Sequence, residues 1–446
     1  MRFYDREKEL ASLQETREIA FNKVSQMTVL TGRRRIGKTK LMLKSCENSP
    51  TVYLFVSRSS EAVLCTQFSQ TIRDSLGAFV PNGIHSFREL FRLLMEIGKQ
   101  KAYNLILDEF QELMNINPSV FSDIQNIWDS TKDDSRVNLM VSGSVHSLMH
   151  QIFMTYKEPL YGRANSIIRL SPFPVTVLKQ IMLDHAPNYQ NDDLLALYAF
   201  TGGVPKYVEL LMDSGAVTKE AMIEHMVREN SVFIEEGNIM LIQEFGKKYG
   251  KYYAILAAIA SGANDVSRIA DATGQKSLGG SLQRLEEDYG LISKLRPIKA
   301  KEGSQTVKYE IKDHFLRFWF RYIVKNQGLV QSEKFDALRS IILQDYPTFS
   351  GHELEAYFRD FLMQTQPISE IGSWWASSRS SKDKDDQNEI DIVAIYMNEK
   401  RVLIAEVKRQ RKRFQPELFE RKVALIKNRL FARYKIDTAC LTLEDM

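Results

Sequence analysis

The sequence predicts an α/β protein that begins with a mostly parallel β-sheet covered by helices on both faces. Short apolar runs that suit buried strands alternate with amphipathic helical segments, which is typical of a parallel sheet. The first apolar run also leads through a glycine-containing turn, at residues 32–39, directly into a helical pattern. Because one hydrophobic core rarely exceeds roughly 250 to 300 residues, the 446 residues of the chain should form several domains.

The first two domains are expected at residues 1–173 and 174–246. In residues 1–173, strands are expected at 27–31, 52–56, 105–107 and 138–141, and helices at 87–99 and 120–130. In residues 174–246 the strand signals vanish and short amphipathic helices remain. That pattern suits a helical lid on the sheet-containing core.

Two smaller domains are expected behind the lid. Residues 247–330 contain three helical patterns, at 252–260, 266–273 and 280–289, and then two β-runs that flank Gly303 and Ser304. Three helices followed by a hairpin predict a winged helix. Residues 331–446 read as a small α/β domain, with a helix near Phe349, strands at 389–396 and 401–407, and a helix at 417–431.

The composition is that of an ordinary globular protein, with 44% hydrophobic and 26% charged residues. The formal net charge is only +4, so any affinity for nucleic acid must come from local patches. Cys46, Cys65 and Cys440 are widely spaced and form no CxxC pair, which fits a reducing compartment. We find no signal peptide and no apolar run near the roughly 20 residues that span a bilayer. The sequence therefore predicts a cytoplasmic protein without a membrane partner.

A phosphate-binding pattern follows the first expected strand. In the pattern G-x-x-x-x-G-K-T, successive backbone N–H groups point at phosphate oxygens, and the helix N-terminus adds its partial positive charge. Lys38 would reach the β- and γ-phosphates, and Thr39 would ligate magnesium. The expected nucleotide-binding residues are Gly32, Arg33, Arg34, Arg35, Ile36, Gly37, Lys38, Thr39 and Lys40. The alternative is an ordinary turn between a strand and a helix.

Two acids, Asp108 and Glu109, end the apolar run at 105–107. A carboxylate pair at the end of a buried strand is costly without a charged partner, and Mg²⁺ would be that partner. Asp108 would hold the metal, while Glu109 would orient and polarise the attacking water. We therefore predict ATP binding and hydrolysis to ADP. Solvated acids at an exposed strand end are the alternative.

Further candidates follow the run at 138–141. Ser142 or Ser144 could place a hydroxyl between the transferred phosphate and the two acids, although a small-residue turn explains them equally well. Arg163 could stabilise the charge on the γ-phosphate, within this chain or across a subunit boundary of a homo-oligomer.

These motifs resemble the archaeal-type ATPase family of the AAA+ and STAND P-loop division. The matching segments, in chain order, are residues 3–10, 32–39, 107–111, 142–144, 160–163 and 201–207. The resemblance implies that Gly203, Val204 and Pro205 lie in the lid near the adenine or ribose, with Pro205 as a nucleotide contact. The residues by themselves predict only a turn that breaks a helix.

The expected winged helix could place residues 277–283 in a DNA major groove. Its expected phosphate contacts are Lys276, Arg284, Lys294, Arg296, Lys299 and Lys301. In the multidomain ATPases that this chain resembles, winged helices also serve as spacers between domains. That alternative stays open.

Asp391, Glu406 and Lys408 lie on two neighbouring expected strands of residues 331–446. Strand residues two apart face the same side, so Glu406 and Lys408 should point into one cleft. Two carboxylates can bind a second Mg²⁺ or Mn²⁺, which activates water, while a lysine steadies the nucleophile or the phosphate. Hydrolysis of a phosphodiester is the predicted chemistry, and ordinary surface ion pairs are the alternative.

This arrangement resembles the PD-(D/E)XK nuclease superfamily, in the variant attached to archaeal-type ATPases. Further matching segments are residues 309–313, 318–322, 351–355 and 371–375. The resemblance implies that an acid on the preceding helix completes a metal site with Asp391 and Glu406. Glu355 is the matching position, and Glu353, on a different helical face, is an alternative. Ile390 stands where the superfamily has proline.

Residues 400–435 contain 13 Lys or Arg and only 3 Asp or Glu. Such a density is expected of a surface that meets phosphates, although it also occurs on solvated faces. Two functions follow. In the first, the nucleotide state controls a metal-dependent nuclease-like domain acting on DNA or RNA. In the second, an ATP-dependent regulatory switch binds nucleic acid or a protein partner without cutting.

Overall fold

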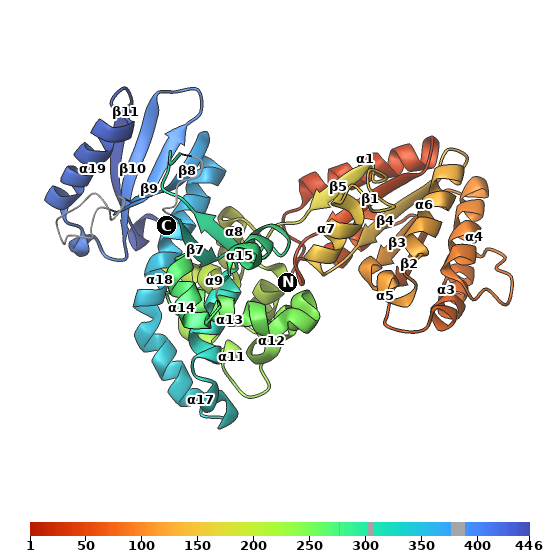
Figure 1. The fold of residues 1–446 in the computed structure, drawn as a ribbon, viewed down its shortest axis with the longest axis horizontal. Coiled ribbons are helices and arrows are strands. Elements are labelled where there is room, and N and C mark those ends of the chain that lie inside the picture. Colours follow the sequence, from red (N-terminus) through yellow and green to blue (C-terminus); the bar gives the residue numbers. More distant parts are fainter. Residues whose placement is uncertain (276, 302–306, 376–388) are drawn as a thin grey trace. The chain divides into compact units, whose positions relative to one another are not determined.

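The computed structural model describes residues 1–275, 277–301, 307–375 and 389–446. It divides into two compact units, which we describe separately: an N-terminal unit of residues 3–171, and a C-terminal unit of residues 172–446 together with residues 1–2 (Figure 1). None of the helices in the described ranges is long and apolar enough to cross a membrane.

The N-terminal unit is built on one five-stranded parallel sheet in the order β2-β3-β4-β1-β5. Its strands are β1 (Gln26–Thr31), β2 (Thr51–Phe55), β3 (Tyr103–Asp108), β4 (Val137–Ser142) and β5 (Ser166–Arg169). Its helices are α1 (Glu7–Asn22), α2 (Lys38–Ser45), α3 (Glu61–Leu76), α4 (Phe87–Gln100), α5 (Leu113–Ile116), α6 (Val120–Thr131) and α7 (His146–Met154). This arrangement confirms the predicted fold class.

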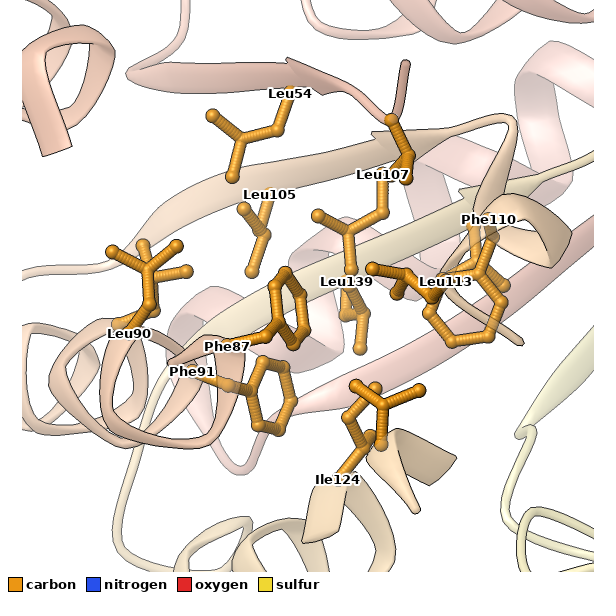
Figure 2. Close-up of a cluster of buried hydrophobic side chains, with 14 of the residues drawn as sticks. Leu54, Phe87, Leu90, Phe91, Leu105, Leu107, Phe110, Leu113, Ile124 and Leu139 are labelled. Atoms are coloured by element: carbon orange, nitrogen blue, oxygen red, sulfur yellow. The ribbon is translucent and has the colours of Figure 1, made fainter. Parts of the chain in front are cut away.

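Two hydrophobic clusters sandwich the sheet, because successive side chains of a strand point to opposite faces. Leu105 and Leu107 of β3 belong to the larger cluster, which includes Phe91 of α4 (Figure 2). Ile106, between them, belongs to the other cluster, together with Leu41 of α2. Strands β1, β3 and β4 are buried along their whole length, as their continuous apolar runs predicted.

The sequence missed β5 at the edge of this sheet. Only Ile168 of its four residues is buried, so it lacks the continuous apolar run that marks the central strands. Its pairing with β1 is nevertheless regular, from Thr28 opposite Ser166 to Thr31 opposite Arg169.

The C-terminal unit begins with helices. They are α8 (Val175–His185), α9 (Asn191–Thr201), α10 (Pro205–Asp213), α11 (Lys219–Met226), α12 (Val232–Phe245), α13 (Tyr249–Ala260), α14 (Val266–Thr273) and α15 (Gly279–Glu287). An antiparallel pair follows, β6 (Ile292–Leu295) with β7 (Lys308–Ile311). Gly303 and Ser304, expected between the two β-runs, lie outside the described residues. Helix α16 (His314–Phe318), a π-helical turn (Trp319–Val324) and α17 (Gln327–Gln331) come next.

The last part of the chain, which we call the C-terminal sheet domain, is a four-stranded sheet with two long helices. Its elements are α18 (Phe335–Thr365), β8 (Ile368–Trp375), β9 (Glu389–Tyr396), β10 (Arg401–Lys408), α19 (Pro416–Leu430) and β11 (Lys435–Thr442). The strand order is β11-β10-β9-β8, with β10 and β11 parallel and the other pairs antiparallel. Its core includes Trp374, Ile404 and Phe419, together with Ile298 from the segment after β6.

Three features of this domain differ from the prediction. Helix α18 begins at Phe335, whereas we expected a start near Phe349, because Pro347 lies inside it and proline usually ends or begins a helix. Strand β8 was missed because its pairing with β9 shifts register twice and its inner residues are only partly buried. Strand β11 was missed because it is an edge strand in which only Thr442 is buried.

Candidate nucleotide site and C-terminal acid cluster

The loop between β1 and α2 has the geometry of a phosphate cradle. Gly32 has φ 145°, and a Cβ atom there would lie 2.7 Å from the carbonyl oxygen of Leu170. Any other residue would therefore clash with the backbone. Gly37, with φ 92°, precedes the first residue of α2. Helix α2 thus begins directly after the loop, and the partial positive charge of a helix N-terminus favours a bound phosphate there.

Lys38 folds back over this loop. Its Nζ donates hydrogen bonds to the carbonyl oxygens of Gly32, at 2.9 Å, and Arg33, at 3.1 Å. The residue is buried, so its ammonium needs such partners. Carbonyl oxygens that hold the ammonium across the loop keep it where a bound phosphate would lie.

Asp108 joins the loop region to the neighbouring strands. Its Oδ2 accepts hydrogen bonds from the Thr39 hydroxyl, at 2.6 Å, and the Tyr53 hydroxyl, at 3.0 Å. Its Oδ1 accepts from Ser142 and, at 3.0 Å, from the backbone N–H of Glu109. Burial, and then the charge of Asp108, raise the pKa of Tyr53, so this phenol remains a donor. A hydroxyl and a carboxylate this close are the oxygen ligands that Mg²⁺ takes, so Thr39 and Asp108 fit the ion.

Glu109 has a strained backbone and fixed partners. Its φ of 55° is uncommon for a residue with a side chain, and such conformations cluster at functional sites. Its Oε2 accepts hydrogen bonds from Gln111 Nε2, at 2.5 Å, and from Ser144 Oγ, at 2.8 Å. The two predicted sensor serines thus contact the two acids separately, Ser142 with Asp108 and Ser144 with Glu109.

Within the described residues, the hydrogen bonds of Arg163 involve neither Asp108 nor Glu109, and Pro205 belongs to a different unit of the chain. Arg163 Nη2 is 3.2 Å from the carboxylate of Asp129, and Nη1 donates to the carbonyl of Tyr161. Pro205 is the first residue of α10 in the C-terminal unit. The roles expected for both residues stay predictions.

In the C-terminal sheet domain, the structure brings Asp391, Glu406 and Lys408 together. Lys408 Nζ lies 3.4 Å from Asp391 Oδ2 and 3.2 Å from Glu406 Oε2. Asp391 also accepts a hydrogen bond from the backbone N–H of Val407, at 2.8 Å. Burial, and then the charge of Glu355, raise the pKa of Asp391 to about 6.

The two candidate acids of α18 have separate surroundings. Glu355 faces Arg359, at 3.8 Å, and Arg359 in turn donates to the backbone carbonyl of Asp391, at 3.2 Å. Glu353 is buried instead against Arg317, at 3.1 Å, and against His314. Glu353 is therefore excluded as a substitute for Glu355, because its carboxylate is used in the core.

Lys422 of α19 is a member of this cluster that sequence reasoning missed. Its Nζ lies 2.5 Å from Glu406 Oε1, and the side chains of both residues are about nine-tenths buried or more. The signal was present in the helical spacing, since Lys422 falls in line with the buried Phe419 and Ile426. The sequence also did not predict a role for Tyr53 and Gln111, which contact the two acids of the nucleotide site.

The predicted second metal site, with Glu355, Asp391 and Glu406 as ligands, is not formed in this arrangement. Within the described ranges, no three His, Cys, Asp or Glu side chains are grouped so that they could hold a metal ion. The physical reason is that both oxygens of Glu406 face lysines and the Asp391 carboxylate faces Lys408. As placed here, these residues do not fit a divalent ion.

The basic stretch at residues 400–435 lies largely on the surface. Its exposed members are Lys400, Arg411, Lys412, Arg413, Arg421, Lys427, Arg429, Arg433 and Lys435. Most of these residues lie on α19 or in the short 3-10 turn Arg411–Arg413 before it.

The residues expected to contact phosphates from the winged helix differ in how exposed they are. Lys276 lies outside the described residues, and Lys299 forms an ion pair with Glu370, at 2.5 Å. Within the expected groove-reading segment, Ser281 and Leu282 are buried. Arg284, Arg296 and Lys301 are exposed, and Lys294 is half-buried.

Two families match the chain. Residues 3–211 match the family described as an ATPase domain predominantly from Archaea. Residues 319–418 match the family described as Archaea bacterial proteins of unknown function. An uncharacterised protein of Methanocaldococcus jannaschii, MJECL04, is 29% identical over 415 residues, which are 91% of this chain and 87% of that protein.

Among solved structures, the Walker-type ATPase PABY2304 of Pyrococcus abyssi is similar, with a TM-score of 0.53 and 20% identity. The match covers 72% of this chain and 96% of that one. At this identity the similarity establishes the fold alone.

Proposed function

We propose that this chain, in which an archaeal-type P-loop ATPase domain precedes a C-terminal domain of a family of unknown function, binds and hydrolyses ATP. We propose further that the nucleotide state controls the C-terminal sheet domain, which acts on DNA or RNA. The observation that carries the first part is the contact of Thr39 with Asp108, because it joins the phosphate loop to the acid strand.

Each residue of the nucleotide site has a role that its contacts support. Lys38 and the backbone amides of residues 32–39 bind the phosphates, and Lys38 exchanges the loop carbonyls for phosphate oxygens. Thr39 and Asp108 would hold Mg²⁺, which neutralises phosphate charge when bound. Glu109 orients the attacking water and draws its proton, while Ser144 and Gln111 fix its carboxylate.

Control of the C-terminal sheet domain is supported by contacts within the C-terminal unit. Tyr198, on the expected lid helix α9, donates its hydroxyl to Asp360 of α18, at 2.7 Å. The same helix α18 carries Glu355 and Arg359 beside Asp391. A displacement of α9 that follows nucleotide binding would therefore reach the acid cluster through α18.

Action on nucleic acid is supported by two features of the C-terminal sheet domain. The exposed lysines and arginines of α19 offer phosphates a positive surface. The convergence of Asp391, Glu406 and Lys408 favours cleavage, since a carboxylate can take a proton from water while an ammonium stabilises a phosphate.

A second candidate function is an ATP-dependent switch that binds nucleic acid or a protein partner without cutting it. The pairing of both Glu406 oxygens with lysines favours this function, because a carboxylate held in this way is not free to act.

One experiment separates the two functions. Purified protein is incubated with plasmid, single-stranded DNA or RNA, with Mg²⁺ or Mn²⁺ and with ATP, ADP or no nucleotide. Cleavage that disappears in Asp391→Ala and Glu406→Ala, and that depends on nucleotide only while Lys38 is intact, supports the nuclease. Binding without cleavage, equal in the two acid variants, supports the switch.

A further inference from the structure

Lys422 and Glu406 form a buried ion pair in the C-terminal sheet domain. The side chains of Lys422 and Glu406 are 10% and 6% exposed, and their charged atoms are 2.5 Å apart. A lysine side chain is rarely buried unless a charged partner balances it, because taking an ammonium group out of water is costly. This lysine sits on a helix, α19, and reaches across to the middle strand pair of the sheet, where Glu406 lies on β10.

The charges around Glu406 are already balanced without a bound ion. Among the residues that the structure describes, the acids are Glu355, Asp391 and Glu406, and each is in contact with at least one of Arg359, Lys408 and Lys422. The ring of His352, which is charged only when protonated, also lies 3.7 Å from Glu355. The two oxygens of Glu406 are divided between the lysines, Oε1 to Lys422 and Oε2 to Lys408. A divalent cation added to this cluster would meet an oxygen that Lys422 holds and a local charge that is already neutral.

We propose that Lys422 is the resident cation of this acid cluster, and that its ammonium keeps divalent cations off Glu406 in the resting protein. The inference rests on the proposed function, because it concerns the site at which the C-terminal sheet domain would act. Lys422 is a positioning residue here: it holds the Glu406 carboxylate and closes it to Mg²⁺ or Mn²⁺ until it is displaced.

The test is a titration of the full-length protein with Mn²⁺ alone, in the absence of nucleotide. Calorimetry, or the electron paramagnetic resonance signal of free Mn²⁺, gives the dissociation constant. Lys422→Met keeps a side chain of similar length and removes the charge. In this variant the dissociation constant for Mn²⁺ should fall at least about tenfold, because groups that contact metal ligands typically change metal affinity by that factor or more. Lys427→Met, an exposed position of the same helix, is the matched control and should bind as the wild type does.

Two further variants keep the result interpretable. Lys422→Gln also lacks the charge but can still donate a hydrogen bond to Glu406, so it serves if Lys422→Met fails to fold. In Lys422→Met combined with Glu406→Gln the added affinity should disappear, which separates this site from the Thr39–Asp108 site. Mn²⁺ affinity that is unchanged or weaker in both single Lys422 variants would overturn the inference.

The outcome is distinguishable from that of the cleavage assay. If the Lys422 variants bind Mn²⁺ more tightly and no form of the protein cuts nucleic acid, the inference stands and cleavage is overturned. If the wild type cuts in Mn²⁺ and the variants bind the ion no more tightly, the inference is overturned and cleavage stands.

Discussion

Arg409, the residue directly after β10, forms an ion pair with Asp192, near the start of α9, with 2.8 Å between Nη2 and Oδ1. Asp192 also pairs with Lys219, at 3.0 Å, and the charged groups of Arg409 and Lys219 each lie 5.2 Å from the centre of the Tyr346 ring. Arg409 directly follows Lys408 of the acid cluster. The expected lid helix is thus tied to the strand that carries Glu406 and Lys408.

This tie should be measurable as a coupling energy. In a double-mutant cycle of Arg409→Met and Asp192→Asn, we expect about 1–3 kcal/mol of coupling in the free energy of unfolding, because the half-buried pair shares Tyr346 and Lys219. Urea unfolding at neutral pH measures it. The matched control is the exposed pair Arg411 and Asp445, for which less than about 1 kcal/mol is expected. Equal coupling in the two cycles would contradict the structural role of Arg409.

Lys38→Ala should weaken ATP binding about ten- to a hundredfold. The wild-type ammonium already lies over the phosphate loop, and charged hydrogen bonds contribute roughly 1.5–3 kcal/mol each. Calorimetric titration with ATP measures the loss. The control is Lys44→Ala, on the same helix, where the side chain is exposed and pairs with Glu47. Normal ATP affinity in Lys38→Ala would remove the basis for the nucleotide site.

Glu109→Gln should leave ATP binding intact and slow hydrolysis about 10²- to 10⁴-fold, the usual contribution of a positioned general base. Glutamine keeps the shape of the side chain but loses its basicity, so binding and hydrolysis should separate. Phosphate release and ATP affinity, measured on the same preparation, check this. Glu112→Gln, three residues further on, removes a carboxylate that pairs with Arg58 and should hydrolyse ATP near the wild-type rate.

The nucleotide site was largely predictable because its chemistry lies in short contiguous patterns. Gly32, Lys38 and Thr39 lie within eight consecutive residues, and Asp108 and Glu109 end one apolar run. By contrast, Tyr53 contacts Asp108 only through the pairing of distant strands, and nothing in its own segment marks it. Gln111 lies two residues after Glu109, inside the matching segment 107–111, but its residue type alone indicates no role. Asp391, Glu406 and Lys408 followed from strand alternation.

The partner that changes the C-terminal site, Lys422, lies on a helix after the strands. A helical pattern shows that a lysine falls on the buried face, but only the packing of α19 on the sheet identifies Glu406 as its partner. The start of α18 could not be predicted for a similar reason, because Pro347 inside the helix made the residues before it look like a separate segment. Local rules fail at such points because tertiary contacts stabilise what the local sequence disfavours.

Glu353 should contribute stability that depends on pH. Burial alone would raise its pKa, but the attraction of Arg317 and His314 outweighs burial and leaves the pKa of Glu353 at about 2, below its usual 4.5. The stabilisation is therefore fully present above about pH 4.5 and is lost as the pH falls through about 2.

Glu353→Gln should cost about 3–5 kcal/mol of unfolding free energy at pH 7, because it removes the buried carboxylate that pairs with the half-buried guanidinium of Arg317. The cost should shrink steadily between pH 4.5 and pH 2, since the wild-type carboxylate becomes protonated there too. Urea unfolding of wild type and variant across this range, with hydrogen exchange of the α18 amides, measures the difference. Glu420→Gln, at an exposed position of α19, should cost less than about 0.5 kcal/mol at every pH. A cost for Glu353→Gln that does not change with pH would mean that shape, and not charge, holds this contact together.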